Sequence, residues 1–164
     1  MTDTLPRVAH EHHERLLRDV DRMPEMGELL LTGDALAVKG AARATSAFLT
    51  DTLLPHVEAA EQSLYPELER MLQNRHSMAP MRREHAQLRL LVGDFVRLAN
   101  EFNVEAIAPG KRLAIRRVLF QLYALLKIHL AEEEAYVRVV EHGVSDDVAD
   151  LLAAALDHPG FQPA

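Results

Sequence analysis

Residues 115–140 read IRRVLFQLYALLKIHLAEEEAYVRVV. Apolar side chains recur in this stretch every three or four residues, which is the spacing of one face of an α-helix. Counted from His129, that face consists of Ile115, Val118, Leu119, Leu122, Leu125, Leu126, Glu133, Tyr136, Val137 and Val140. Only His129 and Glu133 interrupt it with ionisable groups, one helical turn apart. The stretch therefore predicts a long helix with a histidine and a carboxylate on its buried face.

The rest of the chain shows the same helical period, and no window alternates with the period of two that strands require. Residues 24–33 are predicted to be a linker that adds a packed turn, and Pro55 and Pro66 are predicted to kink the second long helix. The expected helices cover residues 6–23, 34–72, about 77–102, 111–142 and a short segment at 145–157. This order predicts an all-α fold, namely an up-and-down four-helix bundle with a short extra C-terminal helix. Residues 1–164 are expected to form one domain, with the bundle core at about 6–142.

The composition excludes several classes of function. The chain has 164 residues, nine histidines and no cysteine, which excludes disulfides, thiolate nucleophiles, iron–sulfur clusters and cysteine-based zinc sites. A net charge of -7 argues against nucleic-acid binding and against attraction to anionic membranes. The start, MTDTLPRVAHEHHER, has no apolar core of signal-peptide length, and no run approaches a membrane span. We expect a cytoplasmic protein.

Each of the four long helices places one histidine among apolar side chains. His13 shares a helical face with Leu16 and Val20, and the same holds for the histidines of the other helices, which are His56, His85 and His129. A buried carboxylate without a partner would cost several kcal/mol, and each neutral histidine needs a partner of its own. One kind of ligand, a metal cation, satisfies all of them together. Imidazole nitrogen and carboxylate oxygen without sulfur suit iron, zinc or manganese.

Four histidines with a carboxylate exceed what a single tetrahedral zinc needs, so two metals sharing a bridging carboxylate fit better. Two alternatives fail on spacing. Ferritin-like di-iron bundles use Glu-x-x-His pairs, and none of the nine histidines follows a glutamate at that distance. The HExxH pattern of zinc proteases is also absent, because the histidine-rich start reads HEHHE.

These residues resemble the hemerythrin-like, HHE cation-binding family, whose order is H, HxxxE, H and HxxxE with one element per helix. The segments that carry the resemblance are EHHERLLRDV around His13, LLPHVEAAEQSLYPEL around His56, MRREHAQLRLL around His85 and RRVLFQLYALLKIHLAEEEAYV around His129. The resemblance spans about residues 8–141. It implies a four-helix bundle around two non-haem irons joined by an oxo or hydroxo bridge. By position, the implied metal ligands are His13, His56, His85, His129 and Glu133.

One ligand position departs from the family pattern. The glutamate expected four residues after His56 is Ala60, whereas Glu61 follows directly. In an ideal helix Glu61 lies about 140° round from His56, not beside it. Three interpretations stay open. Glu61 reaches the metal through a π-bulge that Pro55 and Pro66 favour; another group such as Glu134, Glu58 or solvent replaces the carboxylate; or the site holds one metal or none. We include Glu61 among the expected metal ligands.

The resemblance implies that the site binds O2, or reacts with peroxide or nitric oxide, or reports on oxygen and iron. The third helix lacks the HxxxH of oxygen-carrying hemerythrins, because Met81 lies four residues before His85, so reversible oxygen carriage is disfavoured. We expect a sensor or scavenger of O2 or of reactive oxygen and nitrogen species, or a protein linked to iron homeostasis. The alternative is a metal-poor interaction or regulatory module, suggested by Ala60. Catalase-like or oxidase activity stays open, and no motif indicates an organic substrate.

Overall fold

The computed structural model describes residues 4–102 and 107–142, and every regular element in those ranges is helical. The α-helices are α1 Thr4–Val20, α2 Met23–Thr32, α3 Ala35–Phe48, α4 Leu54–Ala59, α5 Tyr65–Met71, α6 Ala79–Asn100 and α7 Pro109–His142, and the π-helical segments are η1 Leu49–Leu53 and η2 Ala60–Leu64. The predicted all-α class is confirmed. The helix predicted at 145–157 lies outside the described residues.

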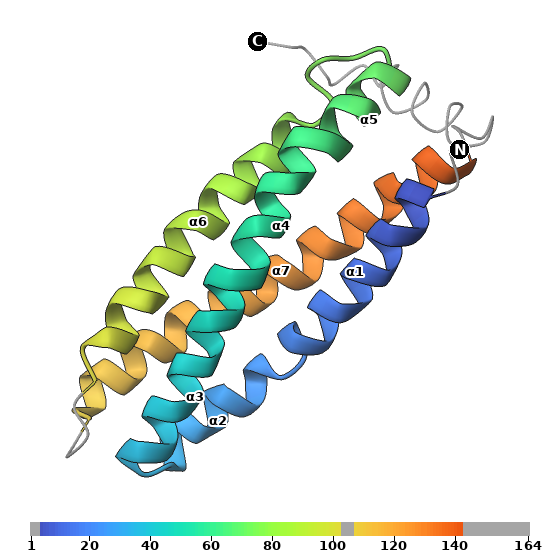
Figure 1. Cartoon of the computed structure of the whole chain (residues 1–164). Helices are drawn as coiled ribbons and strands as arrows, with labels where there is room; N and C mark the ends of the chain where they lie inside the picture. The colour runs from blue at the N-terminus through green and yellow to red at the C-terminus, as the bar shows by residue number, and fades with distance from the viewer. Residues whose placement is uncertain (1–3, 103–106, 143–164) are drawn as a thin grey trace, which may run out of the picture.

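The helices line up into long rods that pack side by side in a bundle (Figure 1). α1 and α2 follow each other along one rod, α3 to α5 form the second, and α6 and α7 are the third and fourth. α7 packs against α1, α2 and α6, and α3 packs against α2 and α6. The start of α1 and the end of α7 lie at the same end of the molecule (Figure 1).

Residues 24–33 differ from the predicted linker, because most of them form the ten-residue helix α2. Pro24 stands in the first turn of α2, where its missing N–H removes no hydrogen bond. Met23, Met26 and Leu30 are buried on one face, with the spacing of a short amphipathic helix. Arg112 of α7 donates to the carbonyl oxygens of Leu30 and Gly33, at 3.1 and 2.9 Å. The packing surface of α7 thus orders a segment too short to be a stable helix alone.

The second rod accommodates its prolines through two π-helical segments. η1 precedes α4, which has Pro55 in its first turn, and η2 precedes α5, which has Pro66 in the same place. A proline cannot donate to the carbonyl four residues earlier and its ring crowds that carbonyl, so a wider turn just ahead relieves both effects. A kink at these prolines stays a prediction, whereas the π turn considered for Glu61 is present.

Two apolar clusters make up the core. The larger one includes Leu16, Leu53, Leu88, Leu126 and further residues of all four rods. The smaller one consists of Ala60, Leu64, Tyr65, Leu68, Met78, Met81 and Val137. Along α4, α6 and α7, the predicted core histidines lie where the larger cluster passes into the smaller one. The core therefore places a polar level between two apolar regions.

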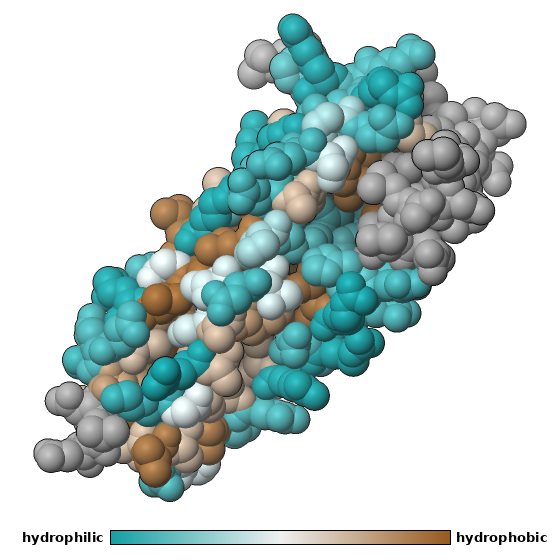
Figure 2. All heavy atoms as spheres, viewed as in Figure 1, coloured by the Kyte–Doolittle hydropathy of each residue, from teal (hydrophilic) through white to brown (hydrophobic). Residues whose placement is uncertain are grey.

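The molecular surface changes in character along the bundle. The face in Figure 2 is mostly hydrophilic towards the α5 end and carries more hydrophobic side chains towards the α2–α3 end. Leu31 and Leu36 are among the exposed large apolar residues. In the described part of the chain, no helix has both the length and the apolar character needed to cross a bilayer.

The close packing of α2 on α7 predicts that a glycine of α2 tolerates substitution by alanine less well than an exposed glycine of α3. A Cβ at Gly27 would lie 2.7 Å from Cζ of Phe120, whose ring is covered by the Arg116 guanidinium at 4.9 Å. A Cβ at Gly40 of α3 would meet no atom within 4 Å. We expect Gly40→Ala to raise the free energy of unfolding by up to about 1 kcal/mol, because alanine is the better helix former. The free energy of unfolding of Gly27→Ala is expected to be about 1–3 kcal/mol lower than that of Gly40→Ala, because the added methyl overpacks the contact with Phe120.

Urea denaturation of both variants measures this difference, and equal m-values would show that only stability has changed. A Gly27→Ala protein as stable as Gly40→Ala would contradict the close approach of α2 to α7.

Candidate metal centre

Five polar side chains are buried at one level of the bundle, and every rod contributes at least one of them. Their exposed fractions range from 0% to 8%. The five residues are His13 of α1, His56 of α4, His85 of α6, and His129 and Glu133 of α7. The sequence predicted a core position for each, and their burial confirms it. Buried groups of this kind need specific partners.

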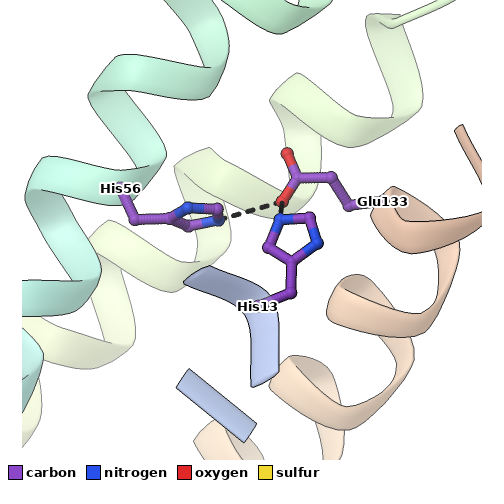
Figure 3. Close-up of side chains that lie close together, drawn as sticks. All are labelled: His13, His56 and Glu133. Carbon is purple, nitrogen blue, oxygen red and sulfur yellow. Dashed lines mark hydrogen bonds and ion pairs between the residues drawn. The ribbon is translucent and has the colours of Figure 1, made fainter. Parts of the chain in front are cut away.

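His13 and His56 point at the same oxygen of Glu133 (Figure 3). Nε2 of His13 lies 3.1 Å from Oε2 of Glu133, and Nε2 of His56 lies 2.9 Å from it. The two rings meet edge to face, with centroids 5.3 Å apart. The three side chains form a first group whose potential ligand atoms all lie within 4.8 Å of one another.

His85 and His129 form a second group with the same glutamate. Their Nε2 atoms are 3.0 Å apart, and Nε2 of His129 lies 3.9 Å from Oε2 of Glu133. The potential ligand atoms of this group also lie within 4.8 Å of one another. Glu133 thus belongs to both groups, each of which could hold a metal ion.

Carboxylates hold the other ring nitrogen of three of these histidines. Glu134 lies 3.1 Å from Nδ1 of His13, Glu61 lies 2.9 Å from Nδ1 of His85, and Glu84 lies 2.8 Å from Nδ1 of His129. At His85 and His129 such a contact fixes the ring orientation and keeps the proton on Nδ1 of a neutral ring, so that the lone pair of Nε2 can bind a metal. The arrangement is typical of metal-binding histidines.

The facing Nε2 atoms of His85 and His129 make the case for a cation. Burial lowers the pKa of His85 to about 4, with the nearby His129 acting in the same direction, and burial also lowers the pKa of His129. Both rings are therefore neutral at pH 7, with their protons on Nδ1. Two nitrogen lone pairs then face each other at 3.0 Å, and a positive ion bound to both removes the repulsion between them.

Glu133 carries a negative charge, which complements that of a cation. Burial opposes its ionisation, but the hydrogen bonds from His13 and His56 outweigh burial and lower the pKa of its carboxyl group. Its Oε1 atom is buried and has no hydrogen-bond partner in the described part of the chain. A buried anionic oxygen without a partner is costly, and a bound cation removes that cost. Donor types, convergence and this orphaned oxygen all fit a metal.

The glutamate five residues after the histidine of each HxxxE-like element contacts a histidine of another rod. Glu61 comes five residues after His56 and contacts Nδ1 of His85, just as Glu134 comes five residues after His129 and contacts Nδ1 of His13. By the same register Ala60 is the counterpart of Glu133. Glu61 lies outside both groups and accepts hydrogen bonds from Arg89, which lower its pKa. That Glu61 itself binds a metal stays a prediction.

Tyr65 is a polar residue of the site that the sequence analysis did not single out. It is fully buried, and its hydroxyl oxygen lies 3.0 Å from Nε2 of His85. Its ring stacks on that of His85 with centroids 5.2 Å apart. Burial raises the pKa of the phenol, and the charge of Glu133 raises it further. A helical count through the π turn of η2, rather than through an ideal α-helix, would have placed it in the core.

The remaining histidines lie outside the two groups. His10 is exposed and contacts Glu134 at 2.6 Å, while the ring of His12 lies 5.1 Å from that of His56. His76 is exposed between α5 and α6. His158 and the side chain of His142 lie outside the described residues.

The site and the fold agree with a comparison against known families. Residues 4–135 match the model of the hemerythrin HHE cation-binding domain. A search of curated proteins and a search of solved structures found no match. The matched residues span all four rods and include the five buried side chains of the site. The chain therefore belongs to the hemerythrin HHE cation-binding domain family.

Proposed function

We propose that this chain is an up-and-down four-helix bundle that holds two non-haem irons between its rods. The observation that carries the proposal is the convergence of two histidine pairs on one buried carboxylate, Glu133. His13 and His56 would hold one metal, His85 and His129 the other, and Glu133 would bridge them. The family match supports a cation as the ligand, and the nitrogen and oxygen donors suit iron.

An iron pair supplies redox chemistry with O2, peroxide or nitric oxide. The protein's own contribution is to exclude bulk water through the two apolar clusters and to hold the imidazoles in place through Glu61, Glu84 and Glu134. We propose that the bound small molecule is O2 or a reactive oxygen or nitrogen species, and that the protein senses or scavenges it or responds to cellular iron. Met81, which replaces a histidine one turn before His85, supports these roles over reversible oxygen carriage.

The first prediction concerns metal content. Wild-type protein expressed with ample iron is expected to contain about two irons per chain, one for each group. His129→Ala is expected to lose most of that iron, because it removes one of the two nitrogen donors of the second group. Metal analysis of purified protein measures the effect, and the exposed His76 gives a matched control in His76→Ala. Unchanged iron in His129→Ala would rule out the assignment.

The second prediction concerns metal removal. A ligand that binds only the folded state stabilises it by about 2.7 kcal/mol when free ligand is about 100 times Kd. We expect chelator-treated protein to melt at a lower temperature than iron-loaded protein, and the melting temperature to rise with added iron. Thermal unfolding followed by circular dichroism measures this shift. Identical melting temperatures, together with absence of bound iron, would favour the alternative of a metal-poor interaction module.

The third prediction concerns the carboxylates that contact Nδ1. Glu84→Gln is expected to weaken iron binding about 10- to 100-fold, because the amide no longer enforces the orientation and basicity of His129. Glu58→Gln is the matched control, since Glu58 is exposed and contacts Gln62. Competition with a chelator of known affinity measures both variants. Equal losses in the two variants, or none in either, would contradict the role assigned to Glu84.

A further inference from the structure

We propose that the phenol oxygen of Tyr65 is itself a ligand of the metal pair and stands in for the carboxylate that Ala60 lacks. This inference rests on the proposed metal centre and adds a ligand to it. Ala60 is the register counterpart of Glu133, so the two histidine pairs share one carboxylate where the HxxxE pattern would give them two. Tyr65 supplies a second oxygen donor from the same rod.

The distances at His85 are those of neighbouring ligands. The Tyr65 oxygen lies 3.0 Å from Nε2 of His85, and Nε2 of His129 lies 3.0 Å from the same nitrogen. Two donor atoms bound at right angles to one metal at about 2.1 Å are themselves about 3 Å apart. The Tyr65 oxygen therefore lies at a distance from Nε2 of His85 that suits two neighbouring ligands of one metal.

The π turn explains how a residue beyond Ala60 reaches that place. The N–H of Tyr65 donates to the carbonyl oxygen of Ala60, so the two residues are stacked one wide turn apart on the same side of the rod. Helical side chains lean towards the N-terminus of their helix. The long side chain of Tyr65 consequently leans back over residue 60, the position at which the HxxxE pattern would have a glutamate.

The hydrogen-bond pattern requires a new partner for Tyr65 once a metal binds. Nδ1 of His85 donates to Glu61, so in the metal-free protein Nε2 accepts the hydrogen bond of the Tyr65 hydroxyl. A metal on Nε2 takes the lone pair that accepts this bond, and the hydroxyl is fully buried. When the oxygen binds the metal, the O–H bond breaks, an oxygen–metal bond forms and the proton is released to solvent.

Charge favours the same arrangement. Glu133 is the one carboxylate shared by both groups, which leaves much of the positive charge of two ferric ions uncompensated. A phenolate adds one negative charge and a hard oxygen donor of the kind that ferric iron accepts from tyrosine in some haem proteins. The guanidinium of Arg82 lies 5.6 Å from the centroid of the Tyr65 ring and stabilises negative charge there.

Phenolate bound to ferric iron has a visible charge-transfer absorption with tyrosinate vibrations in its resonance Raman spectrum, which separates this proposal from the proposed function. The experiment compares iron-loaded wild type, Tyr65→Phe and Tyr136→Phe by iron content, visible absorption and resonance Raman. Tyr136 is the matched control, since it is partly buried and packs against the smaller apolar cluster. We expect the band in wild type and Tyr136→Phe, and its complete loss in Tyr65→Phe.

Iron-loaded wild type without the band would overturn the ligand role and leave the metal centre standing, with Tyr65 then a hydrogen-bond donor to it. A band that persists in Tyr65→Phe would overturn it equally. Wild type that binds no iron would overturn both proposals. The double variant Ala60→Glu, Tyr65→Phe adds a gain-of-binding test. We expect it to recover iron lost by Tyr65→Phe while remaining without the band, and no recovery would contradict the exchange of one oxygen donor for the other.

Discussion

The buried carboxylate of Glu133 is the group on which the arrangement of this bundle depends. It is fully buried, it remains ionised, and two imidazoles from other rods contact one of its oxygens. An isolated carboxylate at this depth would be strongly destabilising. The rods that carry His13 and His56 must therefore pack beside α7 in the register that brings these two side chains to it. Packing of apolar side chains alone would tolerate other registers, whereas this buried charge does not.

A ring of more exposed carboxylates extends the effect of Glu133 outward. Glu61, Glu84 and Glu134 each lie on a different rod from the histidine that they contact. Each contact fixes a ring whose other nitrogen faces the centre, so the inner group is oriented before any ion arrives. Such preorganisation favours the binding of a cation, because the cost of ordering the donors is met during folding.

The smaller apolar cluster has a second role in the same design. Tyr65 belongs to it, yet its hydroxyl reaches His85, so one side chain both closes the core and contacts the site. The π turn that relieves Pro66 also turns Tyr65 inward. A backbone irregularity that looks like a local accommodation of proline thus determines which side chain contacts His85.

The sequence by itself determined the class of the fold and the five buried histidine and glutamate side chains of the site. The helical period around His129 and Glu133, and the single core histidine on each of the other rods, follow from spacing alone because burial of an apolar face imposes that spacing. Spacing also predicted Asp34 as the start of the second rod, where it accepts a hydrogen bond from the N–H of Ala37.

The tertiary structure decided three further features. The surface of α7 ordered residues 24–33 into α2, since a ten-residue helix needs a partner to be stable. Contacts between rods placed Glu61 and Glu84 on Nδ1 atoms of distant histidines, and the π turn brought in Tyr65, because an i,i+5 hydrogen bond breaks the ideal period on which any count along the sequence relies.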